Sequence, residues 1–370
     1  MMRELVIDLD AIVHNYKSMK SRFGTKVQAV VKADAYGHGM VPVALALEAA
    51  GVDSFGVADV QEALALRAAG IKAPILAWLH DPEDDFVAAV SGKVELGIAN
   101  LEQFERIVAA AKSTSVTAKL HLKIDTGLGR NGSSAAAWPA LLEAVKGAAA
   151  SGLVEVVGIF SHLSGTSEAD DLAQIERFDA AVTVADQMGV AYKVLHLTAS
   201  DGSLAYPQAH YDMVRVGIAL YGLDPFSAHR ASEYGLKPAM TAKAKVVQTK
   251  VVEAGQGVSY GYLHTTKTQS TLALVPIGYA EGLPRNATGA AHVSLNGKTY
   301  PISSRVAMDQ FVLDVGNDGV AAGDEVVLFG DPAAGAPSVD DLADACGTIN
   351  YEIVTRMGGR FKRVYLGAGE

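Results

Sequence analysis

Strand-like and helix-like runs alternate through the first two-thirds of the chain, and this alternation restricts the possible folds more than any other feature. Apolar, β-branched runs of strand length recur at comparable spacing, with helix-like runs such as Leu101–Lys112 and Asp171–Met188 between them. Eight such β/α units favour an α/β fold with a closed parallel (β/α)8 barrel of the TIM type over an open sheet. The eight predicted strands are Val27–Val31, Val52–Val57, Ile75–Trp78, Val94–Ile98, Thr117–Ile124, Val154–Phe160, Lys193–Leu197 and Met213–Ile218.

The pattern changes after the loop-like segment Gly222–Pro238, whose residues before proline disfavour a helix. Short β-type runs then dominate, separated in part by turn signals such as Asn296-Gly297. We therefore expect a barrel domain over residues 1–236 and a mostly β domain over residues 237–370. The predicted strands of the second domain are Ala244–Val252, Thr271–Val275, His292–Leu295, Lys298–Ile302, Phe311–Val315 and Glu325–Phe329.

Charge and cysteine content restrict the partners and the compartment. The net charge of −10, from 31 Lys and Arg against 41 Asp and Glu, argues against a nucleic-acid surface, which needs a basic stripe. Cys346 is the only cysteine, so no internal disulfide is expected, and the ten histidines show no convincing metal-ligand spacing. The N-terminus lacks a secretory apolar region, and no apolar run approaches the roughly 20 residues of a membrane span. We expect a cytoplasmic protein that binds small metabolites, with neither nucleic-acid nor membrane partners.

Polar residues occur where several predicted barrel strands end. Lys32 comes directly after the apolar run Ala29–Val31, and Gly37 and Gly39 allow a tight loop behind it. Each such residue alone is more simply explained as an ion-paired cation, a buried histidine or a helix cap. Together they indicate an active site, because barrel enzymes place their chemistry at the carboxyl ends of the strands. The other residues of this rim are Lys123 and Arg130 at the fifth strand, His162 after the sixth, Ser200 after the seventh and Arg215 within the eighth.

Seven short segments, spread over both expected domains, carry a family resemblance. They are VVKADAYGHG (30–39), KIDTGLGRNG (123–132), MVRVGIALYG (213–222), VSYG (258–261), IGYAEG (277–282), RVAMDQ (305–310) and YEIVTR (351–356). In this order they resemble the alanine racemase family of pyridoxal-phosphate enzymes along nearly the whole chain. The resemblance implies interconversion of L- and D-alanine, and with it a supply of D-alanine for peptidoglycan precursors.

The resemblance implies that Lys32 binds pyridoxal 5'-phosphate as a Schiff base. The same amine would then move a proton at the substrate Cα, a task that desolvation and nearby positive charge favour because they deprotonate the amine. Tyr260 would act on the opposite face, since inversion needs a proton removed from one face and returned on the other. Arg215 would face the pyridine nitrogen of the cofactor, which would stay neutral because arginine does not release its proton at ordinary pH.

The remaining site residues are also implied by the resemblance. His162 would lie beside the cofactor ring, and Arg130 with the backbone of Met308 would bind the substrate carboxylate. Lys123 matches a lysine that is often carbamylated in the family, and Tyr279 matches a residue of the substrate entrance. Hydroxyl groups and backbone N–H groups would hold the phosphate. The phosphate-binding set would be Tyr36, Ser200, Gly217, Ile218 and Tyr351.

Three positions depart from the usual family pattern. Ala199 stands where asparagine is frequent, Ala307 replaces a common cysteine, and Glu281 replaces a common aspartate. The first puts one contact of the phosphate loop in doubt. The other two could alter substrate entry or the tolerance for larger side chains.

Other functions remain open at this point. A racemase of the same fold could act on serine or basic amino acids. A barrel decarboxylase usually carries a cysteine-aspartate pair, whereas Gly347 follows Cys346 here, and a non-catalytic cofactor carrier would lack the β domain. The resemblance further implies a homodimer in which Tyr260 and Met308 approach the cofactor held by the other subunit.

Overall fold

A computed structural model describes residues 1–367 of the chain and shows two compact units. The barrel unit comprises Tyr16–Ala35 and Val43–Gly217. The sheet unit comprises Met1–Asn15, Tyr36–Pro42 and the chain from Ile218 onward. Each unit is described by itself below.

The barrel unit contains an eight-stranded parallel sheet in the order β8-β7-β6-β5-β4-β3-β2-β9. The two end strands also meet, because the N–H of Asp212 donates to Leu195 O at 3.1 Å and that of Arg215 to Thr198 O at 3.0 Å. The sheet is therefore a nearly closed barrel, and the predicted fold and all eight strands are confirmed. The strands are β2 Lys26–Val30, β3 Ser54–Val57, β4 Ile75–Ala77, β5 Glu95–Ile98, β6 Ala118–Lys123, β7 Val154–Phe160, β8 Val194–His196 and β9 Met213–Val216.

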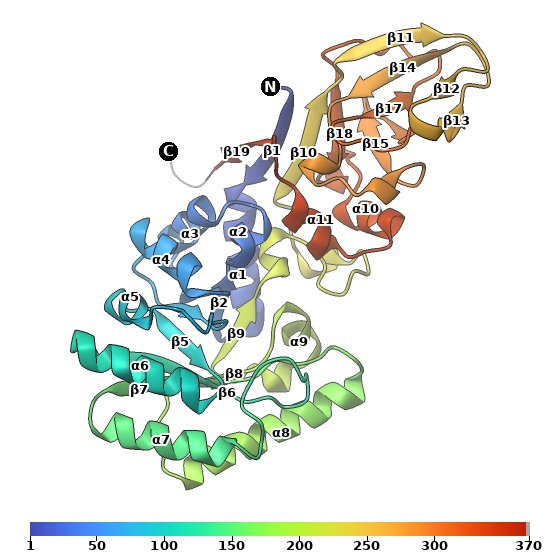
Figure 1. The fold of residues 1–370 in the computed structure, drawn as a ribbon. Coiled ribbons are helices and arrows are strands. Elements are labelled where there is room, and N and C mark those ends of the chain that lie inside the picture. Colours follow the sequence, from blue (N-terminus) through green and yellow to red (C-terminus); the bar gives the residue numbers. More distant parts are fainter. Residues whose placement is uncertain (368–370) are drawn as a thin grey trace. The chain divides into compact units, whose positions relative to one another are not determined.

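Helices follow the barrel strands and lie outside them, as Figure 1 shows for α6, α7 and α8. Side-chain caps begin several of them: Asn100 Oδ1 accepts from Gln103 N at 2.9 Å at the start of α6, and Ser167 caps α8. The strands are nearly continuous apolar runs, as expected for a parallel sheet buried on both faces. The helices of this part of the chain are α1 Leu9–Phe23, α2 Lys32–Tyr36, α3 Met40–Ala49, α4 Val60–Ala68, α5 Phe86–Ser91, α6 Leu101–Thr114, α7 Trp138–Ala150, α8 Glu168–Gln187 and α9 Ser200–Ala205.

The sheet unit is mostly β, as predicted. It contains a six-stranded sheet in the order β16-β15-β18-β10-β1-β19, a three-stranded sheet β11-β14-β17 and the pair β12-β13. Two short α-helices, α10 Val339–Cys346 and α11 Asn350–Arg356, complete it. The strands are β1 Arg3–Asp8, β10 Met240–Lys245, β11 Gln248–Val252, β12 Gly257–Val258, β13 His264–Thr265, β14 Ser270–Val275, β15 His292–Leu295, β16 Lys298–Pro301, β17 Phe311–Asp314, β18 Glu325–Phe329 and β19 Lys362–Leu366.

Two details of the predicted β domain were wrong. The run Ala244–Val252 is not one strand, because the chain leaves β10 after Lys245 and enters a different sheet as β11. Four strands, β1, β12, β13 and β19, were not predicted, and the first of them lies between β10 and β19. The predicted boundary between residues 236 and 237 stays a prediction.

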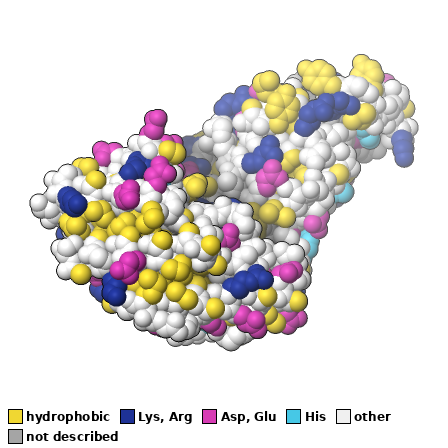
Figure 2. Space-filling view, turned by 60° about the horizontal axis from the view of Figure 1, so that its bottom comes forward, with side chains coloured by type: hydrophobic (Ala, Val, Ile, Leu, Met, Phe, Trp, Pro, Cys, Tyr) yellow, Lys and Arg dark blue, Asp and Glu magenta, His cyan; other side chains and the backbone are white. Residues whose placement is uncertain are grey.

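Charged side chains of both signs are interspersed over the face shown in Figure 2, without a continuous basic stripe in that view. Among the described residues, no helix combines the length and the apolar character needed to cross a membrane.

Candidate active site

The carboxyl ends of the barrel strands bring most of the predicted polar residues of the barrel unit together. Lys123 is the last residue of β6, and Arg215 lies within β9. Lys32 and His162 each follow a strand by two residues, and Ser200 begins α9 after β8. The positive charges of Arg130 and Arg215 lower the pKa of both lysine amines, as described below. Lys123 Nζ and Arg215 Cζ lie 5.4 Å and 5.6 Å from the centroid of the same ring, that of Phe160.

Lys32 is partly buried at this rim. Burial lowers the pKa of its amine, Arg130 and Arg215 lower the pKa further, and Glu62 opposes the change. Its Nζ lies 5.9 Å from the centroid of the Trp78 ring. The environment thus favours the neutral, nucleophilic form of the amine more than bulk water does.

The backbone directly after Lys32 forms a left-handed turn. Ala33, Asp34 and Ala35 have φ between 52° and 55° and ψ between 44° and 51°, a region that residues with a Cβ rarely occupy in succession. The turn is held at both ends, because Ala33 N donates to Glu62 Oε1 at 2.6 Å and Ala35 N to Val31 O at 2.8 Å. Strain of this kind is typical of segments that position a functional group.

Lys123 is the most buried cation of the rim after Arg215, with 6% of its surface exposed. Burial, with Arg215 and Arg130 nearby, lowers the pKa of its amine from 10.5 to about 8. Its Nζ lies 5.4 Å from the centroid of the Phe160 ring. A substantial fraction of this amine is therefore neutral at slightly alkaline pH.

Arg215 is buried and is held by carbonyl and imidazole groups. Its Nη1 donates to His196 O at 3.2 Å and lies 3.1 Å from His196 Nδ1. Its Nη2 donates to Ser161 O and Leu197 O, both at 2.8 Å, and lies 3.0 Å from His162 Nδ1. Burial lowers the pKa of Arg215 to about 10, so the group is a cation at neutral pH. Its bonds within the described chain use Nη1 and Nη2, which leaves Nε for a ligand.

The structure also shows polar groups that the sequence analysis did not single out. Glu95, His121 and His196 are buried in the barrel unit and are bonded in a series to Arg215. One signal for His121 was present, because Lys119, His121 and Lys123 alternate along a strand and so share one face. Nothing in the sequence indicated that Glu95 would lie next to this face.

Ser200 and Gly217 form one predicted contact pair of the phosphate-binding set. The N–H of Gly217 donates to Ser200 Oγ at 2.9 Å, and Ser200 is buried. That bond occupies a lone pair of the hydroxyl and leaves its hydrogen for another acceptor. Ala199, at the cap position of α9, provides no side-chain cap.

The sheet unit holds the other three residues predicted to bind phosphate. The rings of Tyr36 and Tyr351 have centroids 6.3 Å apart, and Tyr36 also lies against Tyr221 with a centroid separation of 4.9 Å. Ile218 is buried at the start of a short 3-10 helix, Ile218–Tyr221. Tyr36, Tyr221 and Tyr351 thus form an aromatic cluster in the sheet unit.

Tyr260, Tyr279 and Met308 are exposed on the sheet unit, with 71%, 43% and 54% of their surfaces accessible. Tyr279 and Met308 are on neighbouring loops, because Tyr279 N donates to Ala307 O at 3.1 Å and Ala280 N to Met308 O at 3.0 Å. Tyr260 is on a different loop, between β12 and β13. Exposed aromatic and methionine side chains of this kind are common where a protein binds a partner.

Glu281, one of the departures from the family pattern, is fully buried beside this loop pair. Its carboxylate accepts a hydrogen bond from Gly278 N at 2.9 Å and forms an ion pair with Arg360. Arg360 also pairs with Asp309 at 2.8 Å. The carboxylate thus links the turn that carries Tyr279 to the loop that carries Met308.

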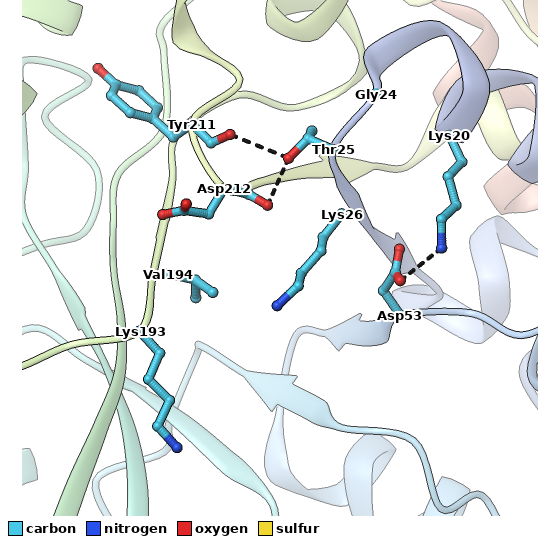
Figure 3. Close-up of a pocket in the computed structure, with 9 residues that line it drawn as sticks. All are labelled: Lys20, Gly24, Thr25, Lys26, Asp53, Lys193, Val194, Tyr211 and Asp212. Carbon is cyan, nitrogen blue, oxygen red and sulfur yellow. Dashed lines mark hydrogen bonds and ion pairs between the residues drawn. The ribbon is translucent and has the colours of Figure 1, made fainter.

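A pocket at the other end of the barrel contains none of the predicted site residues. Figure 3 shows it where β2, β8 and β9 begin, with Lys20 paired to Asp53 at 2.8 Å. Two of its three lysines are paired with carboxylates, since Lys193 also pairs with Glu155. The pocket is lined by Lys20, Gly24, Thr25, Lys26, Asp53, Lys193, Val194, Tyr211 and Asp212.

The donor set at the carboxyl ends of the strands fits a small carbonyl compound with an anionic group. It offers a partly buried amine of lowered pKa at Lys32, a cluster of cations and a hydroxyl donor at Ser200. The described residues contain no cluster of His, Cys, Asp and Glu able to hold a metal ion.

Two family models match nearly the whole chain. Alanine racemase, N-terminal domain, matches residues 7–225, and Alanine racemase, C-terminal domain, matches residues 239–365. An alanine racemase from Salinispora arenicola is 47% identical over 370 residues, which cover 98% of each chain. One from Thermobifida fusca is also 47% identical, over 99% of this chain and 98% of the relative.

Solved structures give the same result. The alanine racemase from D-cycloserine producing Streptomyces lavendulae superposes with a TM-score of 0.96 at 42% identity, over 99% of this chain and 97% of that one. The alanine racemase from Corynebacterium glutamicum superposes with a TM-score of 0.85 at 38% identity, over 99% of both chains.

Proposed function

Because the chain belongs to the alanine racemase family and is therefore an isomerase, we propose that it interconverts L- and D-alanine with pyridoxal phosphate and two proton-transferring side chains, Lys32 and Tyr260. The observation that carries this proposal is the partly buried amine of Lys32 among cations, at the carboxyl ends of the barrel strands. The family membership supports alanine as the substrate.

Pyridoxal phosphate, when bound, supplies an electron sink that stabilises negative charge at the substrate Cα. Lys32 would hold the cofactor covalently, and His162 would lie beside its ring. The hydrogen bond from Gly217 N–H to Ser200 supports a role for Ser200 in phosphate binding, because it orients the hydroxyl. Tyr36, Ile218 and Tyr351 would complete the phosphate-binding set.

Arg215 would face the ring nitrogen of the cofactor through Nε. Its guanidinium is fixed by three carbonyl groups and two imidazoles, so it cannot easily turn away. An arginine supplies no proton at neutral pH, whereas a carboxylic acid in this place would. We therefore expect a weaker electron sink. Side reactions such as transamination should then be less frequent relative to inversion.

The two proton-transferring groups have different surroundings. The lowered pKa of the Lys32 amine supports its use as a base on one face of the substrate. Tyr260 would serve the other face, and its exposure on the sheet unit supports a role at a site completed by a partner subunit. Arg130 and the backbone of Met308 would bind the substrate carboxylate, and Tyr279 would line the entrance.

Lys123 would be a carbamylated side chain in this scheme. Carbamylation needs a neutral amine, and the pKa of about 8 at Lys123 supports that requirement. The modified group would be an anion able to pair with Arg130. We further propose a cytoplasmic homodimer whose product, D-alanine, enters peptidoglycan precursors.

The test is to incubate the purified protein with L-alanine and pyridoxal phosphate in deuterated water. Deuterium at Cα together with appearance of D-alanine is the expected result, and chirality change without deuterium would contradict the two-base scheme, in which the second side chain supplies a solvent-derived proton. A parallel panel of serine, lysine and arginine measures specificity. A several-fold preference for any of them over alanine would reject alanine as the main substrate.

Borohydride reduction followed by peptide mapping tests the position of the cofactor. Lys32 and Lys123 are both amines of lowered pKa at the same rim, so each serves as a control for the other. The reduced cofactor should be found on Lys32 and should be absent from a Lys32→Ala protein. A label on Lys123 in the wild-type protein would contradict the proposal.

A further inference from the structure

A series of four buried polar residues extends from Arg215 to the far side of the barrel interior. Arg215 Nη1 lies 3.1 Å from His196 Nδ1, His196 Nε2 lies 2.9 Å from His121 Nδ1, and His121 Nε2 lies 3.0 Å from Glu95 Oε2. Between 0% and 6% of each residue is exposed. All four belong to the barrel unit.

The chemistry of the two ends fixes the direction of every hydrogen bond between them. A guanidinium only donates, so His196 Nδ1 must accept and carries no proton. The proton of a neutral His196 is then on Nε2, which donates to His121 Nδ1. His121 in turn carries its proton on Nε2 and donates it to Glu95, whose carboxylate only accepts.

Burial supports a neutral ring at His196. It lowers the pKa of His196 well below its usual value, and His121 and Arg215 lower it further. The ring of His196 is also stacked on Phe160, with a centroid separation of 4.8 Å and an interplanar angle of 6°. Lys119 Nζ lies 3.9 Å from Glu95 Oε1, and Arg67 and Lys193 also interact electrostatically with this carboxylate.

The local backbone makes room for the series. The pairing of β6 and β7 shifts between Leu120 and His121, which places Gly158 opposite His121. A Cβ at Gly158 would lie 2.6 Å from His121 Nδ1, so any larger residue there would collide with the ring. The strand irregularity and the glycine are both needed to place the imidazole.

We propose that Glu95 is a positioning residue, which acts through His121 and His196 to keep an acceptor facing Arg215. Without the carboxylate, His121 could move its proton to Nδ1, and His196 would then present Nδ1–H to the guanidinium. Two donors would face each other, and Arg215 would shift from the position in which its Nε meets the cofactor. The catalytic consequence rests on the proposed function, but the proton positions do not.

The first experiment observes the ring nitrogens directly in the wild-type protein. Histidines labelled with 15N would be examined by long-range 1H–15N NMR between about pH 6 and about pH 9, with and without pyridoxal phosphate, and assigned with His121→Gln and His196→Gln proteins. We expect both rings to be neutral with the proton on Nε2. A proton on Nδ1 of either ring would overturn the proposal.

The second experiment compares two substitutions. Glu95→Gln keeps an acceptor oxygen and should retain the wild-type pattern at both histidines. Glu95→Leu removes the acceptor and should change the positions of the protons on both histidines. It should also lower kcat about 10–100-fold, the effect that removing an outer partner of a site residue typically has, and alter KM less than about twofold. The control is Glu155→Leu, which removes a half-buried carboxylate from neighbouring β7 and should change neither property.

Each outcome bears on the proposal. An unchanged histidine pattern in Glu95→Leu would overturn it, and so would an altered pattern in Glu95→Gln. If Glu95→Leu does not fold, the wild-type and Glu95→Gln spectra still test the predicted proton positions on His121 and His196. If the wild-type protein does not racemise alanine, the proposed function fails while the spectra continue to test the series of hydrogen bonds.

Discussion

Arg215 shows how the barrel interior holds a buried cation with neutral partners. Three main-chain carbonyls and two imidazoles surround its guanidinium, and the carboxylate of Asp201 acts on it through space. This arrangement keeps a positive charge at the rim that lowers the pKa of both Lys32 and Lys123. The amines of Lys32 and Lys123 are therefore easier to deprotonate.

The amine of Lys123 should make folding stability depend on pH. Its pKa is about 8 in the folded chain and 10.5 when unperturbed, so between these values the unfolded chain binds more protons at this residue. Stability should therefore rise with pH across that interval. Because Lys123 is buried, the gain from about pH 8 to about pH 10 relative to a Lys123→Met protein should be on the order of 2 kcal/mol.

Urea unfolding of both proteins at about pH 8 and about pH 10, in buffer free of carbon dioxide, measures this difference. The unmodified amine is then the titrating group. Equal changes in the two proteins would show that Lys123 is not the source of the pH dependence.

At the scale of elements, the left-handed turn in α2 is the most unusual feature. Its four residues with positive φ, Ala33 to Tyr36, all carry a Cβ, and the turn is fixed by Glu62 and by the carbonyl of Val31. Such conformations cost about 1–2 kcal/mol per residue. The surrounding barrel must stabilise them, and it thereby sets the direction in which the chain leaves Lys32.

Substitutions at Ala33, which is exposed, should measure this strain. Ala33→Gly should raise the free energy of unfolding by about 1 kcal/mol, because glycine adopts positive φ without a Cβ clash, and Ala33→Val should lower it by at least as much. Urea unfolding provides the measurement. Ala65→Gly, at an exposed position inside α4, is the control and should instead lose about 1 kcal/mol.

At the scale of the whole molecule, the two ends of the chain belong to one sheet. β1 pairs antiparallel with β10 and parallel with β19, and Leu5 and Ile7 on it are fully buried. The first residues of the chain are therefore part of the sheet unit's core, although the barrel follows them in sequence.

Truncation of one buried side chain in β1 should show this dependence. Leu5→Ala should lower the free energy of unfolding by about 2–5 kcal/mol, because it leaves a cavity in the core. Val6→Ala, on the opposite face of the same strand and only partly buried, should cost less. Equal losses in the two proteins would argue against the observed orientation of the strand.

Subunit exchange tests the proposed sharing of the active site. Lys32→Ala and Tyr260→Ala proteins should each be inactive, and their mixture should regain part of the wild-type activity if each site takes these residues from different subunits. Mass spectrometry of differently labelled subunits would verify exchange. Exchange without any recovered activity would reject the shared site.

The sequence by itself determined the eight barrel strands and the polar rim, because both depend on short-range patterns. Apolar runs define buried strands, and a residue at a strand's end lies at the rim whatever its neighbours are. Lys32, Lys123, His162, Ser200 and Arg215 could therefore be placed there before the structure was known.

Only the tertiary structure decided how distant segments meet. The strand β1 pairs with strands more than two hundred residues away, and β10 and β11 belong to different sheets. Glu95 lies beside His121, which is on the next strand of the barrel. These pairings arise from competition among many strands and depend on register shifts that single-residue patterns do not encode. The left-handed turn after Lys32 likewise depends on a carboxylate from another helix, Glu62.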